Sequence, residues 1–363
     1  MCAIVLIPRT FTNRMKDAAI KPDIRRLSVT ELKDVFAEWG EPAFRARQVE
    51  EWLWQKSAHS FAEMTNLSKA LRRRLEGAFA IRPIRTDAVQ HSLDGTVKSR
   101  FRLHDGHLVE SVLIPVAEDK RFTACVSSQV GCSLSCTFCA TGRMKRLRNL
   151  DASEIYDQVV AVNAQAEAEF GHSLTNIVYM GMGEPLLAYR NVLQSIERIT
   201  APRGLGMSPK RITVSTAGIA KMIKRLADDA SKVNLALSLH AADDAKRNEI
   251  MPINEHNNLS VLMEALDYYY RHTRNRISYE YIAFQGFNDT LADAAHLARL
   301  CKRFPVRVNI IEYNPIEGVA FEKSAADRID RFARYLREEG IMVTLRRSRG
   351  KDIDAACGQL ANK

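Results

Sequence analysis

The chain is best understood from one short run, Gly131-Cys132-Ser133-Leu134-Ser135-Cys136-Thr137-Phe138-Cys139, whose cysteines have the spacing C-x3-C-x2-C. Cysteine thiolates are the usual ligands of a [4Fe-4S] cluster, which contains four irons. Three thiolates hold three irons, so the fourth iron is left able to bind a small molecule and pass it an electron. The spacing therefore predicts a [4Fe-4S] cluster on Cys132, Cys136 and Cys139. S-adenosylmethionine (SAM) is the natural chelating molecule, and radical chemistry is the expected result.

Other uses of these cysteines fit the sequence less well. Structural zinc needs four closed ligands, commonly in C-x2-C pairs, and the nearest histidines, His107 and His172, do not have finger spacing. A disulfide framework is not expected, because the chain has seven cysteines and its apolar N-terminal run 1–8 has no basic residues before it, unlike a signal peptide. We expect a reduced cytoplasmic protein.

The bulk composition is that of a soluble globular protein with a basic surface. The 363 residues are enough for a large core and more than one unit. Hydrophobic residues make up 46% and charged residues 26% of the chain, and no apolar run approaches the roughly 20 residues of a membrane span. A net charge of +10 indicates a polyanionic partner such as a nucleic acid, although on its own this signal is weak.

The first part of the chain predicts a small helical module. Ser28 and Glu31 form a capping-box pattern at the start of a helix that ends near Gly40. Two further helices are expected over 42–56 and 64–79, the last containing Arg72-Arg73-Arg74. This arginine run is a solvated face or an RNA contact.

Strands and helices then alternate. Asp94-Gly95 predicts a hairpin turn, and a further strand follows over 108–115. Later strands are expected over 123–128, 174–180, 211–216, 233–239, 278–284, 306–311 and 342–346. Helices are expected over 151–170, 190–200, 220–229, 290–303 and 326–339. This alternation predicts a parallel sheet or barrel with its site at the carboxyl ends of the strands.

Polar residues follow several of these strands. Two glycines and Glu184 in the run 180–185 suit close approach of a ligand, and the carboxylate suits an ammonium group. The other polar strand ends are Ser215, the run Ser238-Leu239-His240, and Asn314. Each alone is more often a loop residue with a local partner, but together with the cysteine loop they indicate a binding site.

Two cysteines lie outside the cluster run. Cys125 belongs to the strand that leads into the cysteine loop, and Cys357 lies in the C-terminal run Asp352-Ile353-Asp354-Ala355-Ala356-Cys357-Gly358-Gln359. Cys301 is expected in a helix core. With the cluster run, 180–184, 238–240 and Met251-Pro252-Ile253-Asn254, these residues resemble the RlmN/Cfr family of radical SAM adenosine methyltransferases, from about residue 28 to 360.

The resemblance implies an α/β fold, with a partial (βα)6 radical SAM barrel, a small N-terminal helical accessory domain and a short β-hairpin segment. The expected organisation is a tail over 1–25, the helical domain over 26–80, a hairpin linker over 81–118, the barrel over 119–346 and a C-terminal segment over 347–363. It also implies SAM contacts, which would come from Gly183, Glu184, Ser215, Ser238, Leu239, His240 and Asn314.

The family also implies a mechanism. Cys357 takes a methyl group from one SAM, and a radical made from a second SAM removes hydrogen from that methyl. The methylene adds to adenine, and Cys125 attacks the Cys357 sulfur to release the base, leaving a Cys125–Cys357 disulfide. Cys125 and Glu110 are both candidates for accepting the ring proton. For Glu110, the alternative is a plain exposed acid in the strand before the barrel.

The implied partners are 23S rRNA, tRNA and an electron donor such as flavodoxin or ferredoxin, with the protein acting as a monomer. The helical module and the run 143–148 are candidate RNA contacts. Short segments favour methylation at C2 of adenine, the RlmN branch, over the C8 methylation of Cfr. A non-catalytic Fe-S RNA-binding protein and a radical SAM enzyme acting on a small molecule are the remaining alternatives; the first would need neither Cys125 nor Cys357.

Overall fold

The computed structural model describes residues 21–363, and the chain divides after Arg82 into two compact units. The apolar run 1–8 lies outside the described residues, as does most of the predicted tail. The last residues of that tail range are packed: Ile24 is 1% exposed, and its amide donates to the carbonyl of Ala80. No helix among the described residues is both long and apolar enough to cross a membrane.

The first unit is helical. Its elements are η1 (Ile24–Arg26), α1 (Val29–Glu38), α2 (Phe44–Trp54), η2 (Phe61–Glu63) and α3 (Lys69–Ala78). The predicted capping box is present. The Ser28 side chain accepts from the Glu31 amide, and the Glu31 side chain accepts from the Ser28 amide. The helix expected over 64–79 begins later, at Lys69, since Ser68 caps it by accepting from the amide of Leu71. The segment before it forms η2 and a turn.

The second unit is built on one ten-stranded sheet in the order β1-β2-β3-β4-β7-β8-β9-β10-β11-β12. Its first strands are β1 (Arg85–His91), β2 (Val97–Arg102), β3 (Leu108–Val116) and β4 (Arg121–Cys125). The remaining strands are β7 (Asn176–Tyr179), β8 (Ile212–Thr216), β9 (Asn234–Ser238), β10 (Ile277–Ala283), β11 (Val306–Glu312) and β12 (Met342–Arg346). From β1 to β4 the pairing is antiparallel, and from β4 to β12 it is parallel.

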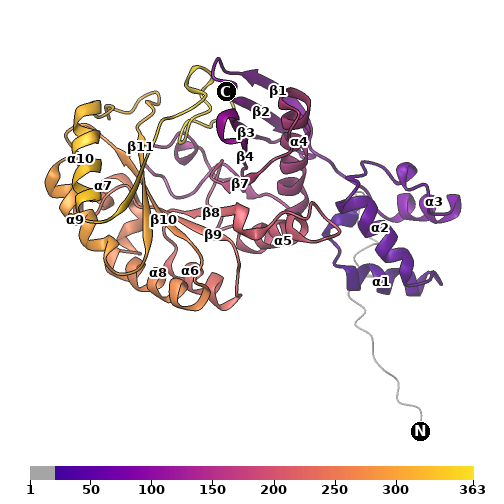
Figure 1. The fold of residues 1–363 in the computed structure, drawn as a ribbon. Coiled ribbons are helices and arrows are strands. Elements are labelled where there is room, and N and C mark those ends of the chain that lie inside the picture. Colours follow the sequence, from indigo (N-terminus) through magenta and orange to yellow (C-terminus); the bar gives the residue numbers. More distant parts are fainter. Residues whose placement is uncertain (1–20) are drawn as a thin grey trace, which may run out of the picture. The chain divides into compact units, whose positions relative to one another are not determined.

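Helices connect the parallel strands and lie on the outer face of the curved sheet (Figure 1). They are α4 (Ala152–Phe170), α5 (Tyr189–Thr200), α6 (Ala220–Asp228), α7 (Asp244–Ile250), α8 (Leu259–Thr273), α9 (Leu291–Cys301) and α10 (Ala326–Glu338). Six helical crossovers thus join seven parallel strands. Within the described residues β12 pairs only with β11, so the barrel is open. The predicted α/β fold with a partial barrel is confirmed.

The core explains this arrangement. Alternate strand residues such as Ile177, Val214 and Leu235 are fully buried. The outer helices are amphipathic, and α6 buries Ile223 and Leu226. Such burial is the main favourable term in folding, at roughly 25 cal/mol for each Å² of apolar surface removed from water.

Some elements differ from the sequence prediction. The strand expected over 174–180 is shorter, since β7 spans Asn176–Tyr179. The ribbon of β5 (Gln129–Val130) and β6 (Arg148–Asn149) was not predicted, nor were α7 and α8. The two-stranded ribbon brackets the cysteine loop and closes its base.

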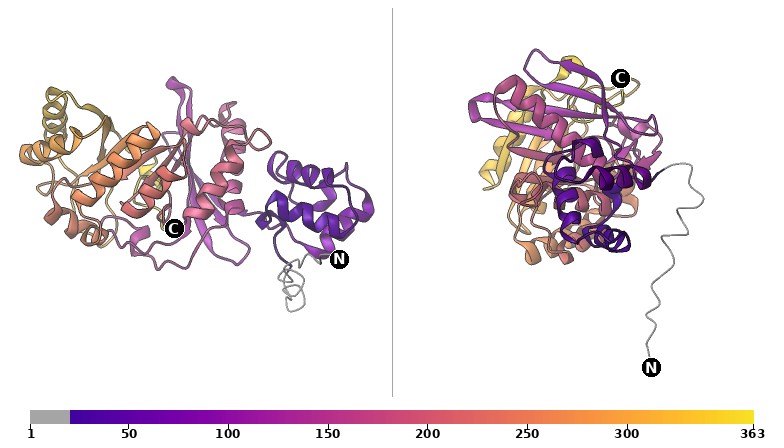
Figure 2. Two further views of the ribbon diagram at one scale, coloured as in Figure 1. Left: turned by 90° about the horizontal axis from the view of Figure 1, so that it is seen from below. Right: turned by 90° about the vertical axis from the view of Figure 1, so that its right-hand side faces the viewer.

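The C-terminus lies at the same end of the second unit as the β1–β2 hairpin, in the right-hand view of Figure 2 as in Figure 1. Hydrogen bonds support this placement, because Asp352 accepts from the Ser92 hydroxyl and from the amide of Leu93. Residues about 260 positions apart in the chain are therefore adjacent.

Candidate active site

The cysteine loop is folded by backbone features that its own sequence supplies. Gly131 has a φ of +74°, and a Cβ there would lie 2.3 Å from the carbonyl oxygen of Lys145. A Cβ at Gly142 would lie 2.9 Å from the carbonyl oxygen of Cys136. Ser135 also has a left-handed backbone, with φ of 54°. The loop is therefore compact because glycine is present where the backbone crosses itself.

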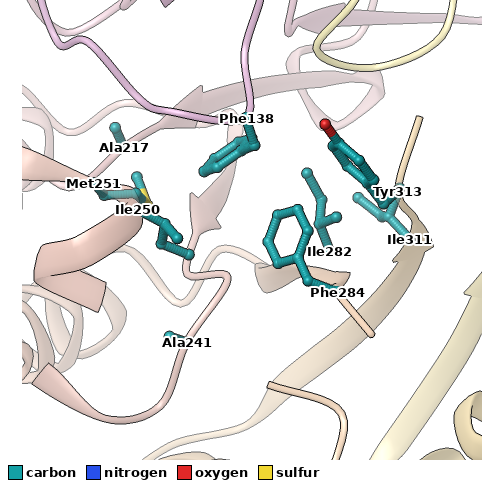
Figure 3. Close-up of a cluster of buried hydrophobic side chains, with 9 residues drawn as sticks. All are labelled: Phe138, Ala217, Ala241, Ile250, Met251, Ile282, Phe284, Ile311 and Tyr313. Carbon is teal, nitrogen blue, oxygen red and sulfur yellow. The ribbon is translucent and has the colours of Figure 1, made fainter. Parts of the chain in front are cut away.

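One aromatic side chain fastens this loop to the barrel. Figure 3 shows Phe138, between the second and third cysteines, lying between Met251 on one side and Ile282 on the other. Its ring meets that of His240 edge-on with centroids 4.8 Å apart, and it lies 5.7 Å from the ring of Phe284. This packing fixes the loop over the carboxyl ends of the strands.

Cys132, Cys136 and Cys139 are free thiols that line one cavity of about 150 Å³. Burial raises their pKa values, that of Cys132 to about 11. Backbone amides of Leu134 and Gly142 act in the opposite direction on Cys132 and Cys139. Half-buried thiols, two of which already receive amide hydrogens, suit a ligand that brings positive charge, as an iron–sulfur cluster does.

The donor set also bears on which metal group fits. In residues 21–363, no group of three or more His, Cys, Asp or Glu side chains converges on a point that would hold a single metal ion. Each thiolate of a cluster binds a different iron, so its ligands need not converge in this way. The geometry suits a cluster better than a single zinc ion.

The end of β7 forms the opposite wall of this cavity. A Cβ at Gly183, where φ is +97°, would lie 2.5 Å from Gln129 Cβ, so glycine lets this strand end pack on the base of the cysteine loop. Glu184 is 3% exposed, and burial raises its pKa to about 7. Its oxygens accept from the amides of Ala217 at 2.8 Å and Leu186 at 3.0 Å. A buried carboxylate at the cavity wall suits a ligand ammonium group.

Further predicted residues line the same cavity, namely Ser215, Ser238 and His240. The two serine hydroxyls are 3.4 Å apart. His240 Nδ1 accepts from the amide of Ile282 at 3.1 Å, and burial together with the nearby Arg247 lowers its pKa to about 3. His240 is therefore neutral, with its other ring nitrogen as a donor.

Two predicted ligand residues do not line this cavity. Leu239 is fully buried, and its amide donates to the carbonyl of Glu280. The Asn314 amide donates to the carbonyl oxygen of Cys357 at 3.4 Å, so it holds the C-terminal segment. Leu239 thus acts through its backbone amide and Asn314 through its side chain.

A second cavity of about 620 Å³ fills the interior of the barrel. Cys125 and Cys357 both line it, and Cys139 belongs to the walls of both cavities. Cys125 and Cys357 are free thiols close enough for the charge of Cys357 to raise the pKa of Cys125, which burial brings to about 12. The structure thus brings together two cysteines separated by most of the barrel sequence.

The structure places two charged residues here that sequence reasoning missed. Glu280 and Arg346 line the barrel cavity, and their side chains form an ion pair at 3.2 Å. The Cys357 side chain is exposed to the cavity. Desolvation there raises the pKa of its thiol, while the Arg346 guanidinium opposes that shift. Both follow the alternation of inward-facing residues on β10 and β12, which is the only sequence signal that points to them.

Arg247 on α7 was also missed. It is fully buried, and its guanidinium donates to the carbonyls of Ala217, Ser238 and Leu239 and to the Asn254 side chain. It thereby connects the carboxyl ends of β8 and β9 to Asn254, in the segment that follows α7. Its positive charge also opposes the burial-induced rise in the pKa of Cys136.

Glu110 is not an exposed acid, as one reading of the sequence had it. It is 0% exposed, and its Oε2 accepts from the amides of Ala361 and Asn362, both at 3.0 Å. The side chain of Lys98 lies 3.6 Å from the other oxygen. Glu110 lines neither the cluster cavity nor the barrel cavity.

The candidate RNA contacts include several arginines that have partners within the protein. Arg148 pairs with Asp105 and Glu154, and Arg143 donates to the carbonyl of Glu317. In the first unit Arg74 stacks on Trp39, with 4.5 Å between the guanidinium carbon and the ring centroid. Part of each basic run is therefore engaged in contacts within the protein.

Two family models match the chain. One is the ribosomal RNA large subunit methyltransferase N-terminal domain, over residues 23–81, and the other is the radical SAM superfamily, over 126–298. A probable dual-specificity RNA methyltransferase RlmN from Cytophaga hutchinsonii is 57% identical over 94% of this chain and 93% of that protein. The chain belongs to the RlmN family of radical SAM RNA methyltransferases.

More distant relatives agree with this membership. The dual-specificity RNA methyltransferase RlmN of Geobacter sulfurreducens is 46% identical, with 94% of this chain and 92% of that protein covered. The crystal structure of a radical SAM methyltransferase from Sphaerobacter thermophilus matches with a TM-score of 0.88 at 40% identity, covering 94% of this chain and all of that one. As a member of the RlmN family the chain is an enzyme, and its family uses SAM and a [4Fe-4S] cluster. The predicted resemblance is confirmed.

Proposed function

We propose that this enzyme methylates C2 of adenine in 23S rRNA and in tRNA, with Cys357 carrying the transferred carbon and Cys125 releasing the product. The observation that carries this proposal is the shared cavity of Cys125 and Cys357, whose wall includes the cluster-loop residue Cys139. A non-catalytic Fe-S protein has no need of two further thiols at this position.

The cofactors fit the residues present. Cys132, Cys136 and Cys139 would hold the cluster, while Glu184 would bind the SAM ammonium group. Gly183, Ser215, Ser238 and His240 would contact the rest of SAM from the strand ends, and Leu239 would support them through its backbone amide. Asn314 would hold the segment that carries Cys357. When bound, these groups supply a methyl group and an organic radical that removes hydrogen.

Cys357 is placed to act as a methyl carrier. A thiol is nucleophilic as the thiolate, so its surroundings control its reactivity. Desolvation within the barrel cavity disfavours the Cys357 thiolate, and the positive charge of Arg346 favours it. Glu280 holds Arg346 in the cavity at 3.2 Å. We assign Arg346 the role of stabilising the Cys357 thiolate while it accepts the methyl group.

Cys125 is placed to break the bond between Cys357 and the base. The ring must first lose a proton to a base and one electron, which a bound cluster would accept. The Cys125 thiolate then attacks the Cys357 sulfur. The S–S bond forms, the bond from sulfur to the transferred carbon breaks, and that carbon takes a proton to become the methyl group. The resulting disulfide is reduced by thiol exchange.

The proton from the adenine ring has two candidate acceptors. Cys125 lines the cavity in which the base would lie, close to Cys357. Glu110 is separated from that cavity, and its Oε2 already accepts two amide hydrogens. Of the two, Cys125 is the better placed.

A flipped base has room in the barrel cavity. The cavity is lined by polar side chains such as Asn176 and Asn309, and it has Arg121, Arg276 and Arg307 near the amino ends of the strands. A base must leave its stack to reach such an interior, and arginines suit the phosphates beside it. The exposed arginines of the helical unit would add RNA contacts.

The relatives are named as dual-specificity RNA methyltransferases RlmN, which favours the RlmN-type C2 reaction on two RNAs over the C8 reaction of Cfr. We propose a cytoplasmic monomer that receives electrons from a flavodoxin or ferredoxin. The decisive experiment is anaerobic reconstitution with iron, sulfide and SAM, followed by incubation with 23S rRNA or tRNA. Nucleoside mass spectrometry should find 2-methyladenosine; finding only 8-methyladenosine, or no methylation, would reject the proposal.

A further inference from the structure

The segment that carries Cys357, residues 350–362 and hereafter the carrier segment, is fixed at both ends. At its start, the amide of Gly350 donates to Asp94 at 2.9 Å, and Asp352 accepts from Ser92 and Leu93 of the same hairpin. These contacts lie at the surface and join the segment to the β1–β2 turn.

The other end is held in the interior. The amides of Ala361 and Asn362 both donate to Glu110 Oε2, at 3.0 Å. Arg100 donates to the carbonyl of Asn362 at 3.1 Å, and the Asn362 side chain donates to the carbonyl of Leu108 at 2.9 Å. Five residues, three of them on β2 and β3 and two in the carrier segment, therefore form one network.

The strand register links this network to Cys125. Val112 on β3 pairs with Cys125 on β4, and Glu110 lies two residues before Val112. Directly paired residues share a face of a sheet, and so do residues two apart on one strand. Glu110 and Cys125 therefore project from the same face of adjacent strands. A contact that holds Ala361 to Glu110 also fixes the carrier segment relative to Cys125.

We propose that Glu110 is a positioning residue that holds Cys357 within reach of Cys125, rather than the acceptor of the ring proton. This inference rests on the proposed roles of the two cysteines. A carboxylate that accepts two amide hydrogens is a stronger anchor than a neutral side chain, because its hydrogen bonds are charge-assisted. The side chain of Lys98, itself only 3% exposed, supplies the balancing charge.

The test measures the equilibrium between the two thiols and their disulfide in the full-length chain, without SAM or RNA. Oxidised glutathione accepts the two electrons: the protein dithiol and one glutathione disulfide give the Cys125–Cys357 disulfide and two glutathione thiols. Acid quenching followed by peptide mass spectrometry quantifies the linked peptides, and cysteine mapping separates them from linkages to the cluster cysteines.

In Glu110→Gln the equilibrium constant for the Cys125–Cys357 disulfide should fall about tenfold, because charge-assisted hydrogen bonds are lost at the anchor. Ala361→Pro removes one of the two amide donors and leaves Glu110 and the sheet unchanged. It should lower the same constant by a smaller factor. In the double variant, the fold-decrease in the constant should be smaller than the product of the two single decreases. Glu118→Gln, an exposed acid in the turn after β3, is the matched control and should leave the constant unchanged.

A second readout separates positioning from proton transfer. In the reconstituted enzyme, Glu110→Gln should slow methylation of Cys357 as well as product release, because both need the carrier segment in place. Wild-type methylation of Cys357 combined with accumulation of a protein–RNA adduct would instead assign Glu110 to the ring proton. Disulfide constants within about twofold of the parent in both Glu110→Gln and Ala361→Pro would also overturn the proposal. Because the glutathione measurement uses no RNA, its outcome is independent of which adenine carbon is methylated.

Discussion

The cysteine loop and the carrier segment hold reactive sulfur in opposite ways. The cluster cysteines lie within eight positions of one another and are placed by local backbone turns such as that at Gly131. Cys357 is placed by contacts with residues far away in the chain, including Asp94 and Glu110. The difference teaches that a local loop can define a cofactor site, whereas the chemistry carried out there depends on long-range folding.

The substitution Cys357→Ala tests this contrast and should have the largest effect. RNA methylation should be lost completely, because the proposed mechanism gives the carbon no other carrier, while the cluster and SAM cleavage should remain. The measurements are nucleoside mass spectrometry for methyladenosine and chromatography for 5′-deoxyadenosine. Cys301→Ala, which changes a buried cysteine of α9 outside the site, is the control. Full RNA methylation by Cys357→Ala would remove this residue from the mechanism.

Cys125→Ala should leave the first half of the reaction intact and block release. RNA should then remain covalently attached to Cys357, since no thiol is present to attack its sulfur. Denaturing gels with labelled RNA, followed by digestion to locate the linked peptide, provide the measurement. Normal turnover in this variant would show that another group releases the product.

Gly131→Ala tests the local side of the comparison. A Cβ at this position meets the Lys145 carbonyl at 2.3 Å, so the loop must open, and iron bound per chain should fall several-fold. Gly106→Ala is the matched control, because Gly106 also has a positive φ, of +86°, but has nothing within 4 Å of a Cβ. Iron analysis after reconstitution distinguishes the two. Equal iron loading would mean that the close approach does not shape the cluster site.

The smallest effect is expected for the pH dependence of stability at His240. Its pKa is lowered to about 3 in the folded protein from 6.5, so the unfolded chain binds more protons between these values. Folding stability from this group is therefore present above pH 6.5 and declines as the pH falls, by about 1.4 kcal/mol for each pH unit within the window. Arg247 faces the ring and contributes to the shift, although burial is the larger cause.

Denaturant unfolding from pH 6.5 to 5 can isolate this contribution. His240→Gln should remove it, so that the difference in unfolding free energy between variant and parent changes with pH in the stated direction. A difference that is constant over this range would contradict a buried neutral histidine.

The sequence predicted the architecture well where the signals were local. Ser28 and Asp151 form the expected capping boxes. The alternation of strands and helices predicted a parallel sheet or barrel, and the structure has an open barrel. Helices α7 and α8 were missed because the run after His240 combines polar and apolar residues without a clear break. The third helix was placed too early because Met64 and Leu67 are core residues of a turn.

The candidate site was predicted in its cysteines and only partly in its surroundings. Glu184, Ser215 and His240 are at the cavity because strand ends converge in such a fold. Arg247 and Glu280 could not be identified, because a buried charge and a solvated charge have the same sequence signature. Their partners are main-chain carbonyls and distant side chains, which only the folded chain brings together.

In the described part of the chain, the open barrel leaves one edge of the sheet unpaired, and an unpaired edge lowers solubility. On the side away from β11, no strand among residues 21–363 pairs with β12, and Met342 on this strand is 59% exposed. Such an edge can template aggregation, and proteins protect edges by keeping them short and charged. Strand β12 spans only Met342–Arg346, and the basic run Arg346-Arg347-Ser348-Arg349 follows at its end. The arginines at the end of β12 therefore also hinder a second chain from pairing with this edge of the sheet.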